Sequence, residues 1–199
     1  MKHLIRVPVG RLTGVYGAHQ KVYEVAGETK RPLWRKYPDH ILILADEPSL
    51  EFESKPYDPN PVAGMTVMMS LLFDVSICQG PKGNNRRVDP VLSAWVDSKS
   101  NGVDGASWSQ LGSEIGKKWL KSRQEKNGFK LIESDLQIDR SEYETLEFIR
   151  KERPIRIGVI DFLGMVEITD AEKFKLAMTN GIGHSKAWGC GLVLCNRVN

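Results

Sequence analysis

Two stretches at opposite ends of the chain carry the residue types best suited to chemistry. Near the end, Gly181, Gly183, Gly189 and Gly191 surround Lys186. Glycine permits positive φ and close backbone approach, and the amides of such a loop can cradle an anion. Because the lysine adds a cation, a phosphate suits this segment. The alternative is a tight turn between a helix and a strand, and composition alone slightly favours that turn.

A histidine near the start offers acid–base chemistry. His19 follows Tyr16 by three residues. Histidine titrates near neutrality and can contribute about 10² to 10⁴ in rate as an acid or base. His3 and His40 lie on or before expected strands, whereas His184 could contact a phosphate or be solvated. By itself, an isolated histidine such as His19 is more often a solvated surface residue.

The cysteines do not suggest a metal or a disulfide framework. Cys78, Cys190 and Cys195 form an odd set without Cys-x-x-Cys spacing. No cluster of His, Cys, Asp and Glu shows ligand spacing in the sequence. We therefore expect no metal, no cofactor and a reduced, cytoplasmic compartment.

Composition is that of an ordinary globular protein. Hydrophobic residues make up 41% and charged residues 27% of the 199 residues, with a formal net charge of +3. That charge is too small to indicate nucleic-acid binding, so clustering of the basic residues must decide. No run approaches the roughly 18 apolar residues of a membrane helix, and the charged N-terminus lacks a signal-peptide pattern.

The first part of the chain predicts one small α/β unit. Apolar or branched runs predict strands over 3–9, 41–45 and 66–78, and periodicity predicts a helix over 18–26 that stops at Gly27. Between them we expect a loop at 11–17, a basic loop at 30–38 anchored by Trp34, and a turn-rich segment at 50–61. This order indicates a ferredoxin-like unit with one helix displaced or lost.

The second part predicts another strand-and-helix unit. The polar, basic stretch 79–87 separates the two, and we place the domains at 1–85 and 86–199. Expected elements are a short helix or strand at 91–96, a helix at 107–124, strands within 129–148 around a turn at 139–141, one strand or two at 155–166 with a bend at Gly158 or Gly164, a helix at 170–178 and a strand at 192–195. Ser107 and Gln110 form a capping box for the long helix. Its Trp108, Leu111, Ile115 and Trp119 predict a buried stripe.

The order of residues in the glycine segment resembles that of a known family. Gly-Ile-Gly-x-x-Lys-x-x-Gly-Cys-Gly-Leu, at 181–192, resembles the C-terminal glycine-rich loop of the CRISPR repeat-RNA endoribonucleases of the CasE subfamily, from type I-E (Cascade) systems. The segment 164–171 looks like that family's strand-to-helix entry, and Tyr16 with His19 is similar to its Tyr-x-x-His catalytic element. Together these stretches cover roughly a quarter of the chain.

The resemblance implies a fold, a reaction and partners. The fold would be α+β, with two tandem ferredoxin-like (RRM-like) domains. The reaction would be metal-independent cleavage of CRISPR repeat hairpin RNA: a 2′-hydroxyl attacks the adjacent phosphate, the 5′-oxygen leaves and a 2′,3′-cyclic phosphate remains. His19 would be the principal acid or base, and Tyr16 would orient the nucleophile or the phosphate. The enzyme would stay on its product (the crRNA) beside other Cascade subunits.

Basic residues cluster where RNA would be held. A basic hairpin of the C-terminal half would enter the groove of the RNA stem. The candidate RNA-binding residues are Arg31, Arg35, Arg86, Arg87, Lys117, Lys121, Arg150, Lys151, Arg153, Arg156, Gly181, Gly183, His184, Lys186, Gly189 and Gly191. Two other functions stay open: an inactive RNA-binding subunit of the same fold, and a small-molecule enzyme that uses the glycine loop for a nucleotide phosphate.

Overall fold

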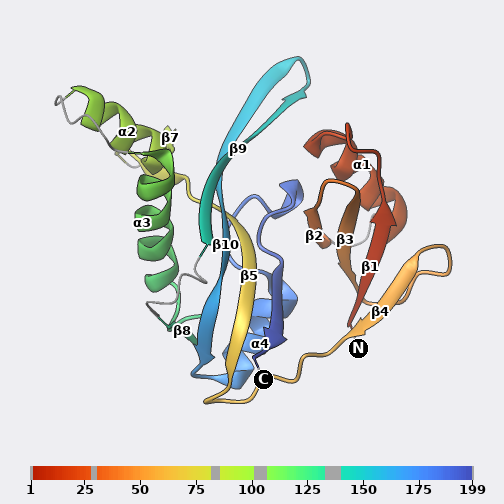
Figure 1. The fold of residues 1–199 in the computed structure, drawn as a ribbon. Helices are drawn as coiled ribbons and strands as arrows, with labels where there is room; N and C mark the ends of the chain where they lie inside the picture. The colour runs from red at the N-terminus through yellow and green to blue at the C-terminus, as the bar shows by residue number, and fades with distance from the viewer. Residues whose placement is uncertain (1, 28–30, 82–85, 101–106, 133–139, 199) are drawn as a thin grey trace.

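A computed structural model describes residues 2–27, 31–81, 86–100, 107–132 and 140–198 (Figure 1). Its elements are β1 (Lys2–Pro8), α1 (Val15–Ala26), β2 (Leu33–Lys36), β3 (His40–Ala45), β4 (Glu53–Tyr57), β5 (Thr66–Asp74), β6 (Ile77–Gln79), β7 (Arg86–Val88), α2 (Pro90–Ser100), α3 (Trp108–Lys121), β8 (Phe129–Leu131), β9 (Arg140–Arg150), β10 (Arg153–Ile168), α4 (Ala171–Asn180), the 3₁₀ turn η1 (Lys186–Trp188) and β11 (Val193–Arg197).

The first sheet has the strand order β2-β3-β1-β4, with every neighbouring pair antiparallel. Alternation along β1 buries Ile5 and Val7, and α1 covers them with Ala18 and Val22. This order is that of a ferredoxin-like unit. The segment between β3 and β4 carries no helix, which agrees with the predicted ferredoxin-like unit with one helix displaced or lost. The strand that completes the unit is β4, however, and not the expected strand at 66–78.

The second sheet repeats this strand arrangement, and its strands β5, β9 and β10 are longer than those of the first sheet. Its order is β11-β5-β10-β8, and β9 pairs with the other part of β10. α4 contributes Phe174 and Met178 to its core, and α3 contributes Trp119, which stacks on Phe73 at 4.1 Å between ring centroids. β9 and β10 form a long hairpin that projects beyond the rest of the sheet (Figure 1). The α+β class and the two ferredoxin-like units are therefore confirmed.

Several expected boundaries were wrong. The helix predicted from residue 18 begins at Val15, so Tyr16 lies in its first turn. The predicted basic loop at 30–38 contains β2, because Trp34 is 1% exposed and the strand pairs with β3. The turn-rich segment 50–61 contains β4, which pairs with β1.

Other boundaries moved within the second sheet. The apolar run 66–78 divides into β5 and β6, and β6 pairs with β7 as a separate hairpin. The 91–96 segment is part of α2. Of the turn expected at 139–141, Asp139 lies outside the described residues, and β9 already begins at Arg140. The strand expected at 155–166 is a single longer strand, β10.

The long helix α3 confirms its predicted cap but only part of its predicted core. Ser107 accepts a hydrogen bond from the amide of Gln110, and the Gln110 side chain accepts one from the amide of Ser107. Trp119 is buried, whereas Trp108 is 37% exposed and stacks against Trp95 at 4.9 Å. Leu111 and Ile115 are half-buried and pack against the core, so Trp108 is the member of the stripe that lies outside it.

The two sheets are joined by the chain between β4 and β5 and by polar contacts. The change of sheet falls within 58–65, ahead of the expected domain boundary after residue 85, because β5 pairs with β10 and β11. Tyr57 donates a hydrogen bond to the carbonyl oxygen of Val193 at 2.9 Å. Arg35 forms a largely buried ion pair with Asp161 of the second sheet at 2.6 Å. These contacts fix one sheet against the other.

Candidate functional site

The imidazole of His19 is fixed by the opposite end of the chain. His19 lies in the second turn of α1, and its Nδ1 is 2.8 Å from the carbonyl oxygen of Ala187 in η1. A carbonyl oxygen can only accept, so Nδ1 carries a proton and Nε2 is left to exchange one with a ligand. The histidine near the start of the chain and the glycine loop near its end therefore meet in the fold.

Aromatic rings enclose the same imidazole. The ring of Trp188 lies 4.6 Å from that of His19, and Tyr23, one helical turn further along α1, lies 4.8 Å away. Phe148 of β9 packs on Trp188 at 4.2 Å. Tyr16 is 6.2 Å from His19 and 38% exposed, so its hydroxyl can reach a ligand beside the imidazole.

The glycines between 181 and 191 are required by close packing. Gly181, Gly183, Gly189 and Gly191 all have positive φ. A Cβ at Gly183 would lie 2.9 Å from Trp119, and one at Gly189 would lie 3.1 Å from Trp34. The loop thus lies directly on buried tryptophans of both units, which supports the alternative of a structural turn.

Hydrogen bonds within the protein already occupy many of the loop's donors, which could otherwise bind a phosphate. The amides of Gly181, Ile182, Gly189, Cys190 and Gly191 all donate to protein carbonyls. The ammonium of Lys186 donates to the carbonyl oxygens of Asn180 at 2.5 Å and Gly181 at 3.0 Å, and partial burial lowers its pKa. Within this loop, which is described throughout, a phosphate cradle would have to use amides between Gly183 and Ala187.

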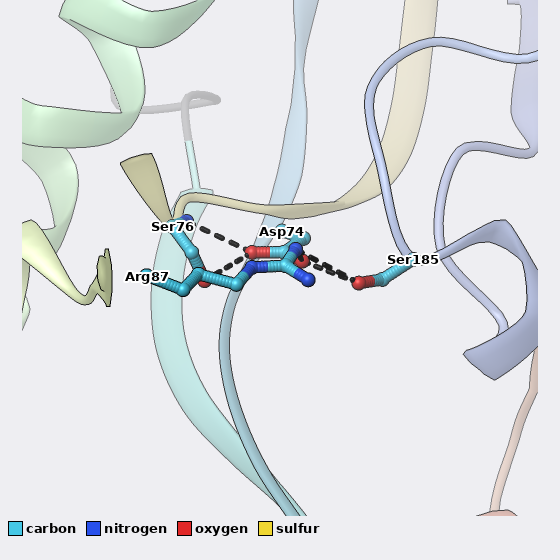
Figure 2. A network of polar contacts seen from close by, with 4 residues as sticks. All are labelled: Asp74, Ser76, Arg87 and Ser185. Atoms are coloured by element: carbon cyan, nitrogen blue, oxygen red, sulfur yellow. Dashed lines mark hydrogen bonds and ion pairs between the residues drawn. The ribbon is translucent and has the colours of Figure 1, made fainter. Parts of the chain in front are cut away.

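A buried carboxylate, that of Asp74, is hydrogen-bonded to the glycine loop at Ser185 (Figure 2). Asp74, at the end of β5, is fully buried and pairs with Arg87 of β7. It also accepts hydrogen bonds from Ser76 and from the hydroxyl of Ser185, and Arg87 donates to Ser185 at 3.2 Å. Arg87 was expected to contact RNA, and the structure places its guanidinium on this carboxylate.

The β9–β10 hairpin presents the expected basic surface. Arg150, Lys151, Arg153 and Arg156 are all exposed around its turn. The guanidinium of Arg150 lies 5.6 Å from the Trp188 ring, and Arg156 pairs with Glu147 at 3.0 Å. The cationic turn of the hairpin therefore lies beside Trp188, one of the rings that enclose His19.

The remaining candidates are spread more widely. Arg31, Arg86, Lys121 and His184 are exposed and Lys117 is half-buried. Arg35 is 6% exposed, and its guanidinium bonds Asp161 and Ser70. The sequence suggested a basic loop at this position, whereas in the fold the charge of Arg35 is paired with Asp161 inside the protein.

A basic hollow behind the loop was not expected as one site. It has a volume of about 500 Å³ and is bordered by the segment that follows α3, by α4 and by the glycine loop. Its cationic lining consists of Arg123, Lys126, Lys173 and Lys186, beside His184. Lys173 pairs with Asp170 at 3.1 Å. The sequence showed the basic C-terminal end of α3 but not its meeting with the loop.

Sequence reasoning also missed the groups that hold the histidine. Tyr23 could have been found, because it lies four residues after His19 on a helix. Trp188 lay inside the glycine segment without an assigned role. Asp74 could have been suspected as the acid that ends an apolar strand. Nothing local pointed to its partners Arg87 and Ser185.

In the part of the chain that the structure describes, no three His, Cys, Asp or Glu side chains gather in an arrangement that could hold a metal ion. None of the helices described has the length and apolar character needed to cross a membrane.

Comparison with known proteins identifies the family. The family model for CRISPR associated protein matches residues 7–197. The fold resembles the CRISPR endoribonuclease Cse3 bound to 19 nt RNA (TM-score 0.74, 19% identity, covering 98% of this chain and 100% of that one). It also resembles Cas6e from Escherichia coli K-12 (0.65, 16%, all of both chains) and a chain in E. coli Cascade bound to a dsDNA target (0.53, 13%, 98% and 99%).

A search of curated proteins found no match. At these identities, the structural likeness establishes the fold, whereas the family model covers nearly the whole chain. The resemblance noted in the glycine loop and the Tyr-x-x-His element is thereby confirmed at the level of the family. The chain belongs to the family of CRISPR associated proteins.

Proposed function

We propose that the chain is an endoribonuclease that cleaves CRISPR repeat hairpin RNA and remains on the crRNA as a Cascade subunit. The observation that carries the proposal is the His19 site, an imidazole oriented by Ala187 and placed beside the turn of a basic hairpin. Its structural relatives support the class of reaction, because they include an endoribonuclease with RNA bound and a Cascade complex.

The proposed chemistry needs only one proton acceptor and one proton donor. The 2′-oxygen of RNA loses its proton and forms a bond to the adjacent phosphorus, the bond from phosphorus to the 5′-oxygen breaks, and that oxygen gains a proton. Nε2 of His19 takes or delivers one of these protons, and the Nδ1–Ala187 bond keeps Nε2 pointed at the substrate. The hydroxyl of Tyr16, a residue that is 38% exposed, contacts the nucleophile or the phosphate.

RNA binding is proposed to begin at the hairpin. Its four exposed cations would lie along the phosphates of an RNA stem, whose A-form geometry hides the base edges in a deep, narrow groove. The cations of the hollow behind the glycine loop would extend this surface to the strand that leaves the stem. Affinity should therefore fall steeply with salt.

The test is cleavage of a CRISPR repeat hairpin RNA in EDTA. We expect cutting at one position, a product that ends in a 2′,3′-cyclic phosphate, and no cutting when a 2′-deoxy nucleotide replaces the scissile one. Cutting of the 2′-deoxy RNA would contradict the mechanism, because the nucleophile would then have to be water. Tight binding without any cutting would indicate the inactive RNA-binding subunit.

A further inference from the structure

Asp74 is a charged group held inside the protein by three separate segments. Its side chain is fully buried. Oδ1 accepts hydrogen bonds from the amide and hydroxyl of Ser76 at 2.8 and 2.6 Å, and Oδ2 accepts from Arg87 and Ser185. A buried carboxylate is stable only when donors surround it in this way. The end of β5, the β6–β7 hairpin and the glycine loop are thereby fixed to one point (Figure 2).

Ser185 is the contact that matters for the loop. Its φ is +53°, a left-handed conformation that residues other than glycine keep only when their surroundings hold them there. Its hydroxyl donates to Asp74, and its carbonyl oxygen accepts from the amides of Trp188 at 2.8 Å and Cys190 at 3.4 Å. Ser185 therefore sets the start of η1, two residues before Ala187.

We propose that Asp74, Arg87 and Ser185 form a positioning device for His19: by fixing η1 they hold the Ala187 carbonyl where it keeps the imidazole in its Nδ1–H form. The expected effect on RNA cleavage rests on the proposed function. The claim itself concerns only which ring nitrogen of His19 carries the proton. The three residues do not touch the imidazole themselves, so they act through the loop. Arg87 accordingly serves the loop, although it lies on a basic segment.

The test uses Ser185→Gly. Glycine accepts positive φ without strain, so this change removes the hydroxyl bond and leaves the backbone conformation allowed. The matched control is Ser49→Gly, which also removes a half-buried turn hydroxyl, one that accepts from the amide of Phe52 at 3.0 Å far from the loop in sequence. Arg87→Gln is the second test variant and acts through the same carboxylate.

The first readout is the tautomer of His19 by long-range ¹H–¹⁵N NMR at about pH 8, where an ordinary imidazole is neutral. The signal is assigned by its loss in a His19→Gln variant. We expect the Nδ1–H form in the wild type and in Ser49→Gly, and a growing share of the Nε2–H form in Ser185→Gly and Arg87→Gln. An unchanged tautomer in both test variants would overturn the proposal.

The second readout is the single-turnover cleavage rate. We expect a loss of about tenfold in Ser185→Gly and Arg87→Gln, with RNA affinity within about twofold of the wild type, because only the orientation of the reacting group changes. Equal losses in the Ser49→Gly control would also overturn the proposal. If the wild type itself cuts no RNA, the proposed function fails, while the tautomer measurement still decides the positioning role.

Discussion

His19 and Ala187 are 168 positions apart in sequence, yet Nδ1 of one lies 2.8 Å from the carbonyl oxygen of the other. This bond joins the first helix of the chain to its last loop. Trp188, the next residue, packs against both His19 and Phe148 of the basic hairpin. One short segment therefore connects the proposed proton-transfer group with the proposed RNA-binding surface.

Removing a hairpin charge should weaken RNA binding in a salt-dependent way. For Arg153→Gln we expect weaker binding and a decrease of about one in the slope of log K against log salt, since one phosphate contact is lost. The control is Lys175→Gln, an exposed charge on α4, at the other end of the molecule from the hairpin turn (Figure 1). Equal slopes in the wild type and Arg153→Gln would remove this residue from the interface.

Adding one carbon to the glycine loop should destabilise the whole protein. Gly183→Ala forces a side chain onto positive φ and places its Cβ 2.9 Å from Trp119, so we expect a loss of about 1–3 kcal/mol. Gly10→Ala is the control, because its Cβ would meet Thr13 at an ordinary 3.7 Å. Urea unfolding measures both. Equal stability of the two variants would contradict the close packing of the loop on Trp119.

Breaking the ion pair between the sheets should be costly. Asp161→Ala leaves the Arg35 guanidinium buried without its charged partner, which should cost about 3 kcal/mol. The double variant Arg35→Met with Asp161→Ala should recover part of that loss, because no unpaired charge remains. Urea midpoints of the two single variants and the double variant provide the coupling energy. Strictly additive losses would show that the pair contributes nothing.

Stability should fall in acid partly through Asp170. The amide of Lys173, and then its side chain, hold the pKa of this helix-capping carboxyl below its ordinary 3.8. The folded pKa is thus below the unfolded one, so the contribution is complete above pH 3.8 and is lost as the pH falls through the folded value. Asp170→Asn keeps a capping oxygen without a charge.

Urea midpoints measured from pH 7 down to pH 2.5 should therefore decline less below about pH 4 in Asp170→Asn than in the wild type. The difference between the two proteins should stay constant above that range. Parallel curves through the acid range would contradict a role for Asp170 in acid unfolding.

Structural features that depend on neighbouring residues were predicted correctly from the sequence. The capping box of Ser107 and Gln110 and the stop of α1 at Gly27 depend on neighbouring residues, and both formed as predicted. Strand β2 was misread because Arg35 and Lys36 suggested a solvated loop. The partner that allows Arg35 to be buried, Asp161, lies 126 positions away, and no local pattern reveals such a pairing.

The candidate site shows the same difference between local features, which the sequence reveals, and contacts between distant segments, which it does not. His19 and the glycine segment were singled out by their resemblance to the CasE subfamily, and the fold brings them together. The groups that orient the imidazole come from distant segments: the Ala187 carbonyl, the Trp188 ring and the Asp74 network. A backbone carbonyl has no signature in a sequence, so the orienting bond could be found only from the structure.

The central claim is tested most directly by the single-turnover cleavage rate of His19→Ala on CRISPR repeat hairpin RNA, with RNA affinity measured on the same samples. The account predicts a rate loss of about 10² to 10⁴, with affinity nearly unchanged because the hairpin still binds the stem. A His19→Ala protein that cuts as fast as the wild type would contradict it.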